Sequence, residues 1–338
     1  MTQKDTTELL RRLKRLLAQD PTLAARLAAI TDDGNVVGDY NVATVTKQSA
    51  GDYAVQIGQL NLTLSADQLR SLPVSAYTAS PLPAASTQLP WEPEMIPIRA
   101  GEFLMGSDPG RDRYAESGEQ PQHTLYLSDY YIAKTPVTNA QYVAFVHATD
   151  HVMPPHWKSG KPPEGKEDHP VVCVSLQDAV AYCNWLSGVT GKAYRLPSEA
   201  EWEKGARGTD GRIYPWGNEP PDERRCNFGY RVKRTTPVGH YSPQGDSPYG
   251  CADMAGNVWE WTRSLWGEHW RNPDFKYPYD CYDGRENPKA STHALRVLRG
   301  GAFDDGDWLV RCAYRRGLDP YSRLRISGFR VVAALVRP

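Results

Sequence analysis

Residues 296–332 constrain the fold of this chain more than any other stretch, because their ends have strand patterns and their middle has no period. Residues 296–299 and 328–332 look like short strand pieces, each next to a glycine. Between them, aromatic, acidic and arginine residues follow neither a helical nor an alternating pattern. Such a segment is a poor core element, so we expect a loop-rich fold that presents it as a contact surface.

The composition of the chain sets the broad class of protein. Its 338 residues are 23% charged and 40% hydrophobic, with a formal net charge of −1, as in a soluble globular protein with one large and one smaller domain. A near-neutral charge disfavours binding to nucleic acid through its phosphates. No apolar run approaches the roughly 20 residues that span a bilayer, and the first residues lack the layout of a signal peptide. We therefore expect a cytoplasmic protein with no membrane span and no nucleic-acid partner.

Cysteine usage disfavours a zinc or iron–sulfur site. The six cysteines form no C-x-x-C pair, and in a reducing cytosol we expect most of them to be buried thiols. They are Cys173, Cys183, Cys226, Cys251, Cys281 and Cys312.

The patterns along the chain predict a small N-terminal unit, a linker and a large domain. Residues 7–30 have helical apolar spacing, residues 31–65 alternate in the manner of strands, and residues 65–72 form a short helix. Five prolines mark residues 73–93 as a linker. The predicted domains are thus an N-terminal unit over 1–72 and a domain over 94–338. The N-terminal unit is either an adaptor that self-associates or recruits an effector, or a stabilising extension.

The large domain begins with a strand, a turn and a strand over residues 95–107. Three helices then follow, each preceded by a residue suited to cap its N-terminus: Thr138, Ser175 and Ser198. The last of them carries Glu201 three residues after its cap, which predicts a capping box.

Seven motifs of this domain resemble the formylglycine-generating-enzyme (sulfatase-modifying factor) family, in order, over roughly residues 94–332. They are Leu104-Met-Gly-Ser, Lys134-Thr-Pro-Val-Thr-Asn-Ala-Gln-Tyr, Pro170-Val-Val-Cys-Val-Ser, Arg195-Leu-Pro-Ser-Glu-Ala-Glu-Trp-Glu, Tyr214-Pro-Trp-Gly-Asn, Gly256-Asn-Val-Trp-Glu-Trp and Leu298-Arg-Gly-Gly. The resemblance implies an α+β, C-type-lectin-like, loop-rich fold. Five tryptophans, four of them within these motifs, are expected in the core: Trp185, Trp202, Trp216, Trp259 and Trp261.

The resemblance also bears on catalysis. Enzyme members of the family oxidise a substrate cysteine with two copper-binding cysteines, placed between the Arg-Gly-Gly and Arg-Cys-Ala motifs. Here residues 302–310 contain no cysteine, and Cys312 matches a non-catalytic position. Copper(I) needs soft thiolate ligands, so we expect no copper and interpret the chain as a pseudo-enzyme. An oxidoreductase that acts on cysteine or other sulfur substrates is the alternative.

Other family members bind iron through histidines. His123, His151, His156 and His169 lack the spacing of that histidine set, so the iron-dependent branch of the family is also unexpected.

Residues 296–332 alternate between family motifs and residues without a regular pattern. In this they resemble the variable proteins of diversity-generating retroelements, which belong to the same family. Residues 296–301, 311–315 and 328–332 match their constant segments. The residues between would then form a hypervariable surface that binds a protein or peptide without chemistry; the alternative is that they are ordinary loop residues. The candidate ligand-binding residues are Phe303, Asp304, Asp305, Asp307, Trp308, Leu309, Tyr314, Arg316, Leu318, Tyr321, Ser322, Leu324, Arg325, Ile326 and Ser327.

Aromatic residues and arginine dominate the binding energy at interfaces. The expected anchors of the surface are therefore Trp308, Tyr314, Tyr321, Arg316 and Arg325. The three acids at 304, 305 and 307 suggest a basic or hydrogen-bond-donating edge on the ligand.

Residues 249–261 resemble the calcium loop of the family. The implied ligands are the Asp253 side chain, the Gly256 and Val258 carbonyls and the Glu260 carboxylate, an oxygen set that suits calcium. The ion would be structural. The alternative is that Glu260 forms an ion pair or a cap.

Overall fold

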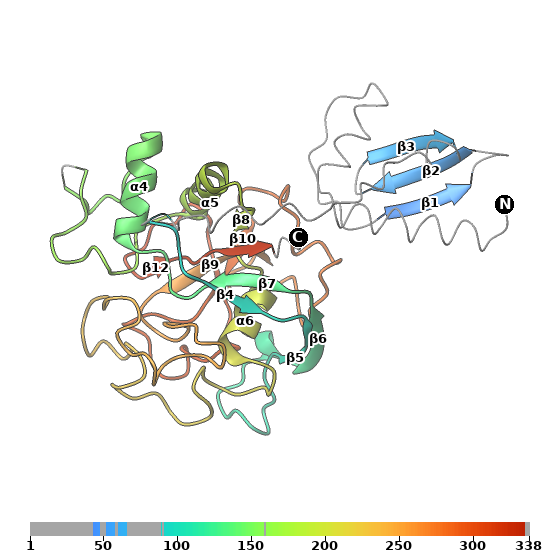
Figure 1. Ribbon diagram of the computed structural model, residues 1–338. Helices are drawn as coiled ribbons and strands as arrows, with labels where there is room; N and C mark the ends of the chain where they lie inside the picture. Colours follow the sequence, from blue (N-terminus) through green and yellow to red (C-terminus); the bar gives the residue numbers. More distant parts are fainter. Residues whose placement is uncertain are drawn as a thin grey trace, which may run out of the picture. The chain divides into compact units, whose positions relative to one another are not determined.

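The computed structural model describes three strands in the first part of the chain (43–47, 52–57 and 60–65) and then residues 89, 91–158 and 160–334. The chain divides into two units, Met1–Thr87 with Val336–Pro338, and Gln88–Leu335 (Figure 1). Among the described residues, no helix is both long and apolar enough to cross a membrane. The cytoplasmic location stays a prediction.

The first unit contains an antiparallel sheet in the order β1-β2-β3, formed by β1 (Ala43–Lys47), β2 (Asp52–Ile57) and β3 (Leu60–Ser65). The strands expected from the alternating pattern are therefore present. The helix expected over 7–30 lies outside the described residues, as do most of the helix expected over 65–72 and most of the linker.

The second unit is built on three small sheets. The first has the order β4-β7-β13-β8, the second pairs β5 with β6, and the third has the order β11-β10-β9-β12. The strands are β4 (Met95–Ile98), β5 (Gly101–Met105), β6 (His123–Leu127), β7 (Tyr130–Ala133), β8 (Tyr194–Arg195), β9 (Trp259–Gly267), β10 (Leu295–Arg299), β11 (Arg316–Leu318), β12 (Ser327–Gly328) and β13 (Val332–Ala334). The strands β4 and β5 flank a turn, as expected, but each pairs with a different partner.

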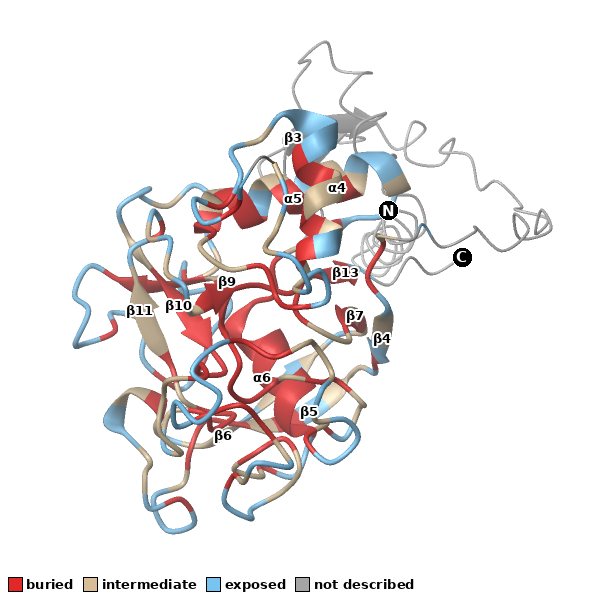
Figure 2. Cartoon of the chain, turned by 90° about the vertical axis from the view of Figure 1, so that its left-hand side faces the viewer, coloured by how far each residue is buried: buried red, intermediate tan, exposed pale blue. Residues whose placement is uncertain are grey.

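Three α-helices and one short 3-10 helix complete the second unit: α4 (Asn139–Thr149), α5 (Leu176–Thr190), α6 (Glu199–Arg207) and η1 (Ser117–Glu119). The three predicted caps are confirmed. The hydroxyls of Thr138, Ser175 and Ser198 accept hydrogen bonds from the backbone N–H three residues on, at 3.2, 3.2 and 3.1 Å. All nine residues of α6 are buried, so this helix lies inside the unit (Figure 2).

Aromatic side chains fill much of the core. Trp202, Trp259 and Trp261 are at most 1% exposed, whereas Trp185 and Trp216 are only half-buried. Loop-rich folds have few long apolar faces, so large rings that fill irregular space carry the packing.

Buried arginines fix the C-terminal part of the chain to distant elements. Arg299 pairs with Glu203, Arg311 with Glu119, Arg315 with Glu199, and Arg330 with Glu260, and every arginine here is at most 5% exposed. We call these four residues the frame arginines. A buried guanidinium that loses its carboxylate is left uncompensated, so each pair strongly favours this one arrangement of the backbone.

Candidate ligand-binding surface

Residues 303–327, here called the C-terminal surface, leave the core at a turn that requires glycine. Gly300 and Gly301 have φ values of 97° and 72°. A Cβ on Gly301 would lie 2.7 Å from the side chain of Val310, so a larger residue would displace the returning chain. Farther along, the guanidinium of Arg311 donates a 2.7 Å hydrogen bond to the carbonyl of Trp308. The backbone under Trp308 is thereby tied to a frame arginine.

Three of the predicted binding residues are exposed. Trp308 is 46% and Tyr321 51% exposed, and the side chain of Arg325 is 64% exposed. The others are half-buried, apart from two that the structure places in the interior. The half-buried residues are Asp304, Asp305, Asp307, Leu309, Tyr314, Arg316, Leu318, Ser322, Leu324 and Ile326.

The expectation that Phe303 and Ser327 are exposed surface residues is wrong. Phe303 is 3% exposed, since its ring stacks on Tyr230 at 6.3 Å and lies under the guanidinium of Arg325. Ser327 is fully buried because it belongs to β12, which pairs with Trp259 of β9.

The predicted anchors differ in position. Tyr314 packs against the core near Trp259, at 5.9 Å between ring centroids, and burial raises its pKa to about 12. Arg316 lies over the ring of Trp259. These two residues form the floor of the surface, whereas Trp308, Tyr321 and Arg325 project from it.

The acidic residues of the surface have partners within the chain. Asp305 accepts a 2.8 Å hydrogen bond from the backbone N–H of Ala302, and burial raises its pKa. Asp304 lies 3.7 Å from Arg325, and Asp307 accepts from the hydroxyl of Tyr114 at 3.3 Å. They shape the loop, so they do not define a free acidic edge for a basic ligand.

A second loop extends this surface, and no motif in the sequence marks it. The backbone N–H groups of Gly229 and Tyr230 donate to the carbonyls of Asp305 and Phe303, both at 2.7 Å. Tyr230 is 43% exposed and has a left-handed φ of 57°. This turn aligns residues 228–234 with the C-terminal surface.

The other edge of the surface is held by backbone contacts with the start of α5. The N–H of Cys173 donates to the carbonyl of Leu324, and that of Leu176 to the carbonyl of Pro320, both at 3.0 Å. The guanidinium of Arg323 then pairs with Asp178 at 2.8 Å. The arginine was not predicted as a site residue.

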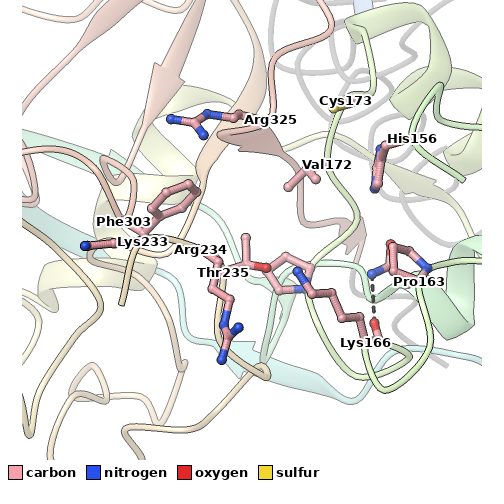
Figure 3. A pocket seen from close by; sticks show the side chains of 12 residues that line it. His156, Pro163, Lys166, Val172, Cys173, Lys233, Arg234, Thr235, Phe303 and Arg325 are labelled. Carbon is pink, nitrogen blue, oxygen red and sulfur yellow. Dashed lines mark hydrogen bonds between the residues drawn. The ribbon is translucent and has the colours of Figure 1, made fainter. Parts of the chain in front are cut away.

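A pocket of about 240 Å³ opens between the two loops and α4 (Figure 3). It shares Phe303 and Arg325 with the C-terminal surface, and the remainder of its wall comes from segments that were not predicted. Its lining residues are Asn139, His156, Pro163, Lys166, Pro170, Val172, Cys173, Lys233, Arg234, Thr235, Phe303 and Arg325. Cys173 has a left-handed φ of 60°, and burial raises the pKa of its thiol, so it is protonated at neutral pH.

The predicted calcium ligands do not fit an ion as they are arranged. Both carboxylate oxygens of Glu260 accept from Arg330, at 2.6 and 2.7 Å, and one also accepts from the indole of Trp202. Asp253 is half-buried and accepts a hydrogen bond from the N–H of Gly239 at 2.6 Å; loss of solvent around its carboxylate raises its pKa to about 6. Glu260 thus forms the ion pair that was the alternative. The calcium site implied by the sequence stays untested, and this arrangement disfavours it.

The donor set does not fit copper either. Residues 302–310 contain no cysteine. The nearby Cys312 is fully buried, and burial raises the pKa of its thiol to about 12. Among the described residues, no group of three or more histidine, cysteine or acidic side chains is placed to hold a metal ion.

Comparison with known proteins finds relatives for most of the chain. A family model described as the sulfatase-modifying factor enzyme 1-like domain matches residues 79–335. The formylglycine-generating enzyme of Thermomonospora curvata is 36% identical over 299 residues, which cover 71% of this chain and 93% of that enzyme. The hercynine oxygenase of Mycolicibacterium smegmatis is 30% identical over 303 residues, covering 79% of this chain and 67% of that enzyme.

Solved structures match over a similar range. PvdO from Pseudomonas aeruginosa has a TM-score of 0.59 and 28% identity, and covers 73% of this chain and 97% of its own. Treponema denticola variable protein 1 has a TM-score of 0.54 and 26% identity. The match covers 71% of this chain and 94% of that protein. The predicted α+β, C-type-lectin-like, loop-rich fold class is confirmed.

The expectation that the chain is not an enzyme is wrong. The relatives named above are enzymes at 30–36% identity, and they point to an enzyme. The sequence argument rested on one pair of copper ligands. Relatives named for two different activities show that this domain supports more than one reaction, so the absence of one donor pair does not by itself exclude catalysis.

Proposed function

We propose that this chain, which belongs to the sulfatase-modifying factor enzyme 1-like family, recognises a protein or peptide through its C-terminal surface. The matching model covers residues 79–335, so the resemblance inferred from the seven motifs is confirmed. Because relatives are enzymes, the protein or peptide would be bound as a substrate. The recognition step is the part that the geometry supports best.

One observation supports this proposal most strongly. The side chain of Trp308 is exposed, while its backbone is held in place by a hydrogen bond to a buried ion pair. Trp308 is 46% exposed, while Arg311, which binds its carbonyl, is fully buried and contacts Glu119 through two hydrogen bonds. Large aromatic side chains contribute much of the energy at interfaces, and a rigid backbone lowers the entropy lost on binding. Tyr321, 51% exposed, gives a second such ring.

We further propose that the segment 296–332 is diversified. The name of one structural neighbour, a variable protein with 26% identity, supports this proposal. A near-copy of the codons for 296–332 that differs chiefly at adenines, beside a reverse-transcriptase gene, is the expected genomic context. If neither the copy nor the gene is present, diversification is rejected and the recognition proposal remains.

Binding is tested with a peptide selected from a display library against the full chain. Trp308→Ala and Tyr321→Ala should each lower the affinity of the chain for that peptide, whereas Trp270→Ala should leave the affinity unchanged. Trp270 is a matched control because it is 69% exposed and lies outside residues 303–327. Equal affinities for all three variants would reject the C-terminal surface as the recognition site.

A second candidate function is an oxidoreductase that acts on cysteine or other sulfur substrates. The names of the relatives favour it. The test is oxygen uptake by the full chain with a cysteine-containing peptide, with and without added copper. The control contains the peptide and copper without the protein. Oxygen uptake above that of the control supports this reaction, and uptake equal to that of the control rejects it.

For the N-terminal unit we propose self-association or recruitment of an effector. The β1-β2-β3 sheet ends in two edge strands, and such edges pair readily with other chains. Light scattering during size exclusion compares the full chain with residues 88–338. If the full chain alone has a multiple of the monomer mass, self-association is supported. If both are monomers, recruitment of an effector and the stabilising extension are the readings that remain.

A further inference from the structure

Among the described residues, those that line the pocket beside the C-terminal surface include cations and no carboxylate. Four of its twelve lining residues are positively charged: Lys166, Lys233, Arg234 and Arg325. In a chain with a net charge of −1, a lining of one sign is a local feature that the composition does not explain. A concave surface of one charge concentrates the field and attracts the opposite ion.

Most of this charge is not neutralised within the chain. Among the described residues, Lys166, Lys233 and Arg234 have no carboxylate within ion-pair distance, and Arg325 lies 3.7 Å from Asp304 with its side chain 64% exposed. Figure 3 shows Lys166 and His156 on one wall and Lys233, Arg234 and Arg325 on the other. The side chains of Lys233 and Arg234 are exposed, so turning toward a bound anion costs them mainly rotamer entropy.

The backbone holds the wall around Lys166 in place without using its ammonium group. The N–H of Lys166 donates to Pro163 at 3.1 Å, and its carbonyl accepts from the side chain of Asn139 at 2.8 Å. Asn139 is 3% exposed, and its Oδ1 atom is buried without a hydrogen-bond partner. A ligand with a donor as well as an anionic group would therefore satisfy both Asn139 and Lys166.

We propose that this pocket binds an oxyanion, namely a phosphoryl, sulfo or carboxylate group, carried by the ligand of the C-terminal surface. The inference rests on the proposed function for its larger ligand. A volume of about 240 Å³ is below the roughly 300–1,000 Å³ of sites for whole small molecules, so the pocket accommodates one group. Phe303 and Arg325 belong to both the pocket and the C-terminal surface, so one ligand reaches both.

The test measures binding of inorganic phosphate, sulfate and acetate to the full chain by calorimetry, with chloride keeping the ionic strength constant. Lys166→Gln should weaken the preferred anion tenfold or more, which is the usual effect of removing a hydrogen bond to a charged group. Lys161→Gln is the matched control, because Lys161 is exposed, belongs to the same loop and does not line the pocket. Lys161→Gln should remain within twofold of the wild type.

A second variant protects the test against a folding defect. Arg234→Gln changes an exposed side chain on the opposite wall and should also weaken the anion. No anion binding to the wild type, or equal weakening by the Lys161 and Lys166 variants, would overturn the inference. A mixed-sequence oligonucleotide that binds more tightly than phosphate and depends on Lys166 would also overturn it, by assigning the cations to nucleic acid.

The two proposals fail in different ways. Trp308→Ala should lose the selected peptide but keep phosphate, because Trp308 does not line the pocket. If none of the three anions binds while binding of the peptide still depends on Trp308, only the oxyanion site is rejected. If phosphate binds and the peptide is indifferent to Trp308 and Tyr321, the recognition surface is rejected and the pocket stands as an anion site.

Discussion

Arg311 and Glu119 form a buried, two-pronged ion pair although 192 residues separate them in the chain. The two guanidinium nitrogens donate at 2.9 and 2.7 Å to the two carboxylate oxygens, and Asp112 accepts a further bond at 2.6 Å. The same guanidinium donates to the carbonyl of Trp308. One side chain thus connects the region around η1 with the backbone of Trp308, whose exposed ring belongs to the C-terminal surface.

Replacing that arginine should destabilise the protein strongly. Arg311→Met leaves two buried carboxylates without a cation, and removing one partner of a buried pair typically costs about 3–5 kcal/mol. The free energy of unfolding from urea titration measures the loss. Arg224→Met is the control. Arg224 pairs with Asp222 at an exposed site, and such pairs contribute about 0–1 kcal/mol to the free energy of unfolding. Similar losses in the two variants would contradict a structural role for Arg311.

The surface aromatics should matter for binding and not for folding. Trp308→Ala is expected to weaken a selected peptide about 30-fold or more, because interface hot spots contribute about 2 kcal/mol or more. Its melting temperature should match that of the wild type, since the ring is 46% exposed. A large drop in melting temperature would instead assign the ring to the core.

Acid should weaken the attachment of the C-terminal surface to α5. Burial on its own raises the pKa of Asp178, but hydrogen bonds from Arg323, Ser175 and His151 outweigh it and lower the pKa to about 2. An acid whose folded pKa is depressed adds stability above its unfolded pKa of about 4 and loses it as the pH falls toward 2. The effect is about 2 kcal/mol in order of magnitude.

Urea titrations between pH 5 and pH 2 measure this effect. Asp178→Asn removes the titrating group, so the stability of that variant should fall less steeply over the same range. Parallel curves for the variant and the wild type would show that other carboxylates cause the acid sensitivity.

The calcium loop gives a further prediction. Because Arg330 already neutralises Glu260, we expect a chelator to leave the melting temperature unchanged and Arg330→Met to lower it markedly. A fall in melting temperature with chelator, reversed by added calcium, would restore the calcium site implied by the sequence.

Local patterns in the sequence predicted the local structure well, because they act over a few residues. The caps at Thr138, Ser175 and Ser198 each need only a hydroxyl and the N–H three residues on. The sequence did not predict which strands pair with each other. The pairing of β4 with β7, for example, depends on contacts between residues far apart in sequence.

The site itself was only partly predictable. The sequence pattern predicted a surface position for Trp308, Tyr321 and Arg325, which are exposed, but it did not show that Phe303 is interior. The pocket joins side chains from several separate segments, and Lys166 and Arg234 carry no signal that would bring them together. Its charge becomes visible only in three dimensions.

The attachment of the C-terminal surface through main-chain atoms has a consequence for protein engineering. Leu324 and Pro320 are held through their carbonyls, and Asp305 and Phe303 receive the neighbouring loop through theirs. A main-chain bond is indifferent to the side chain that its residue carries. A combinatorial library that randomises Trp308, Tyr321, Ser322 and Arg325 together should therefore yield mostly folded members, from which affinity reagents could be isolated.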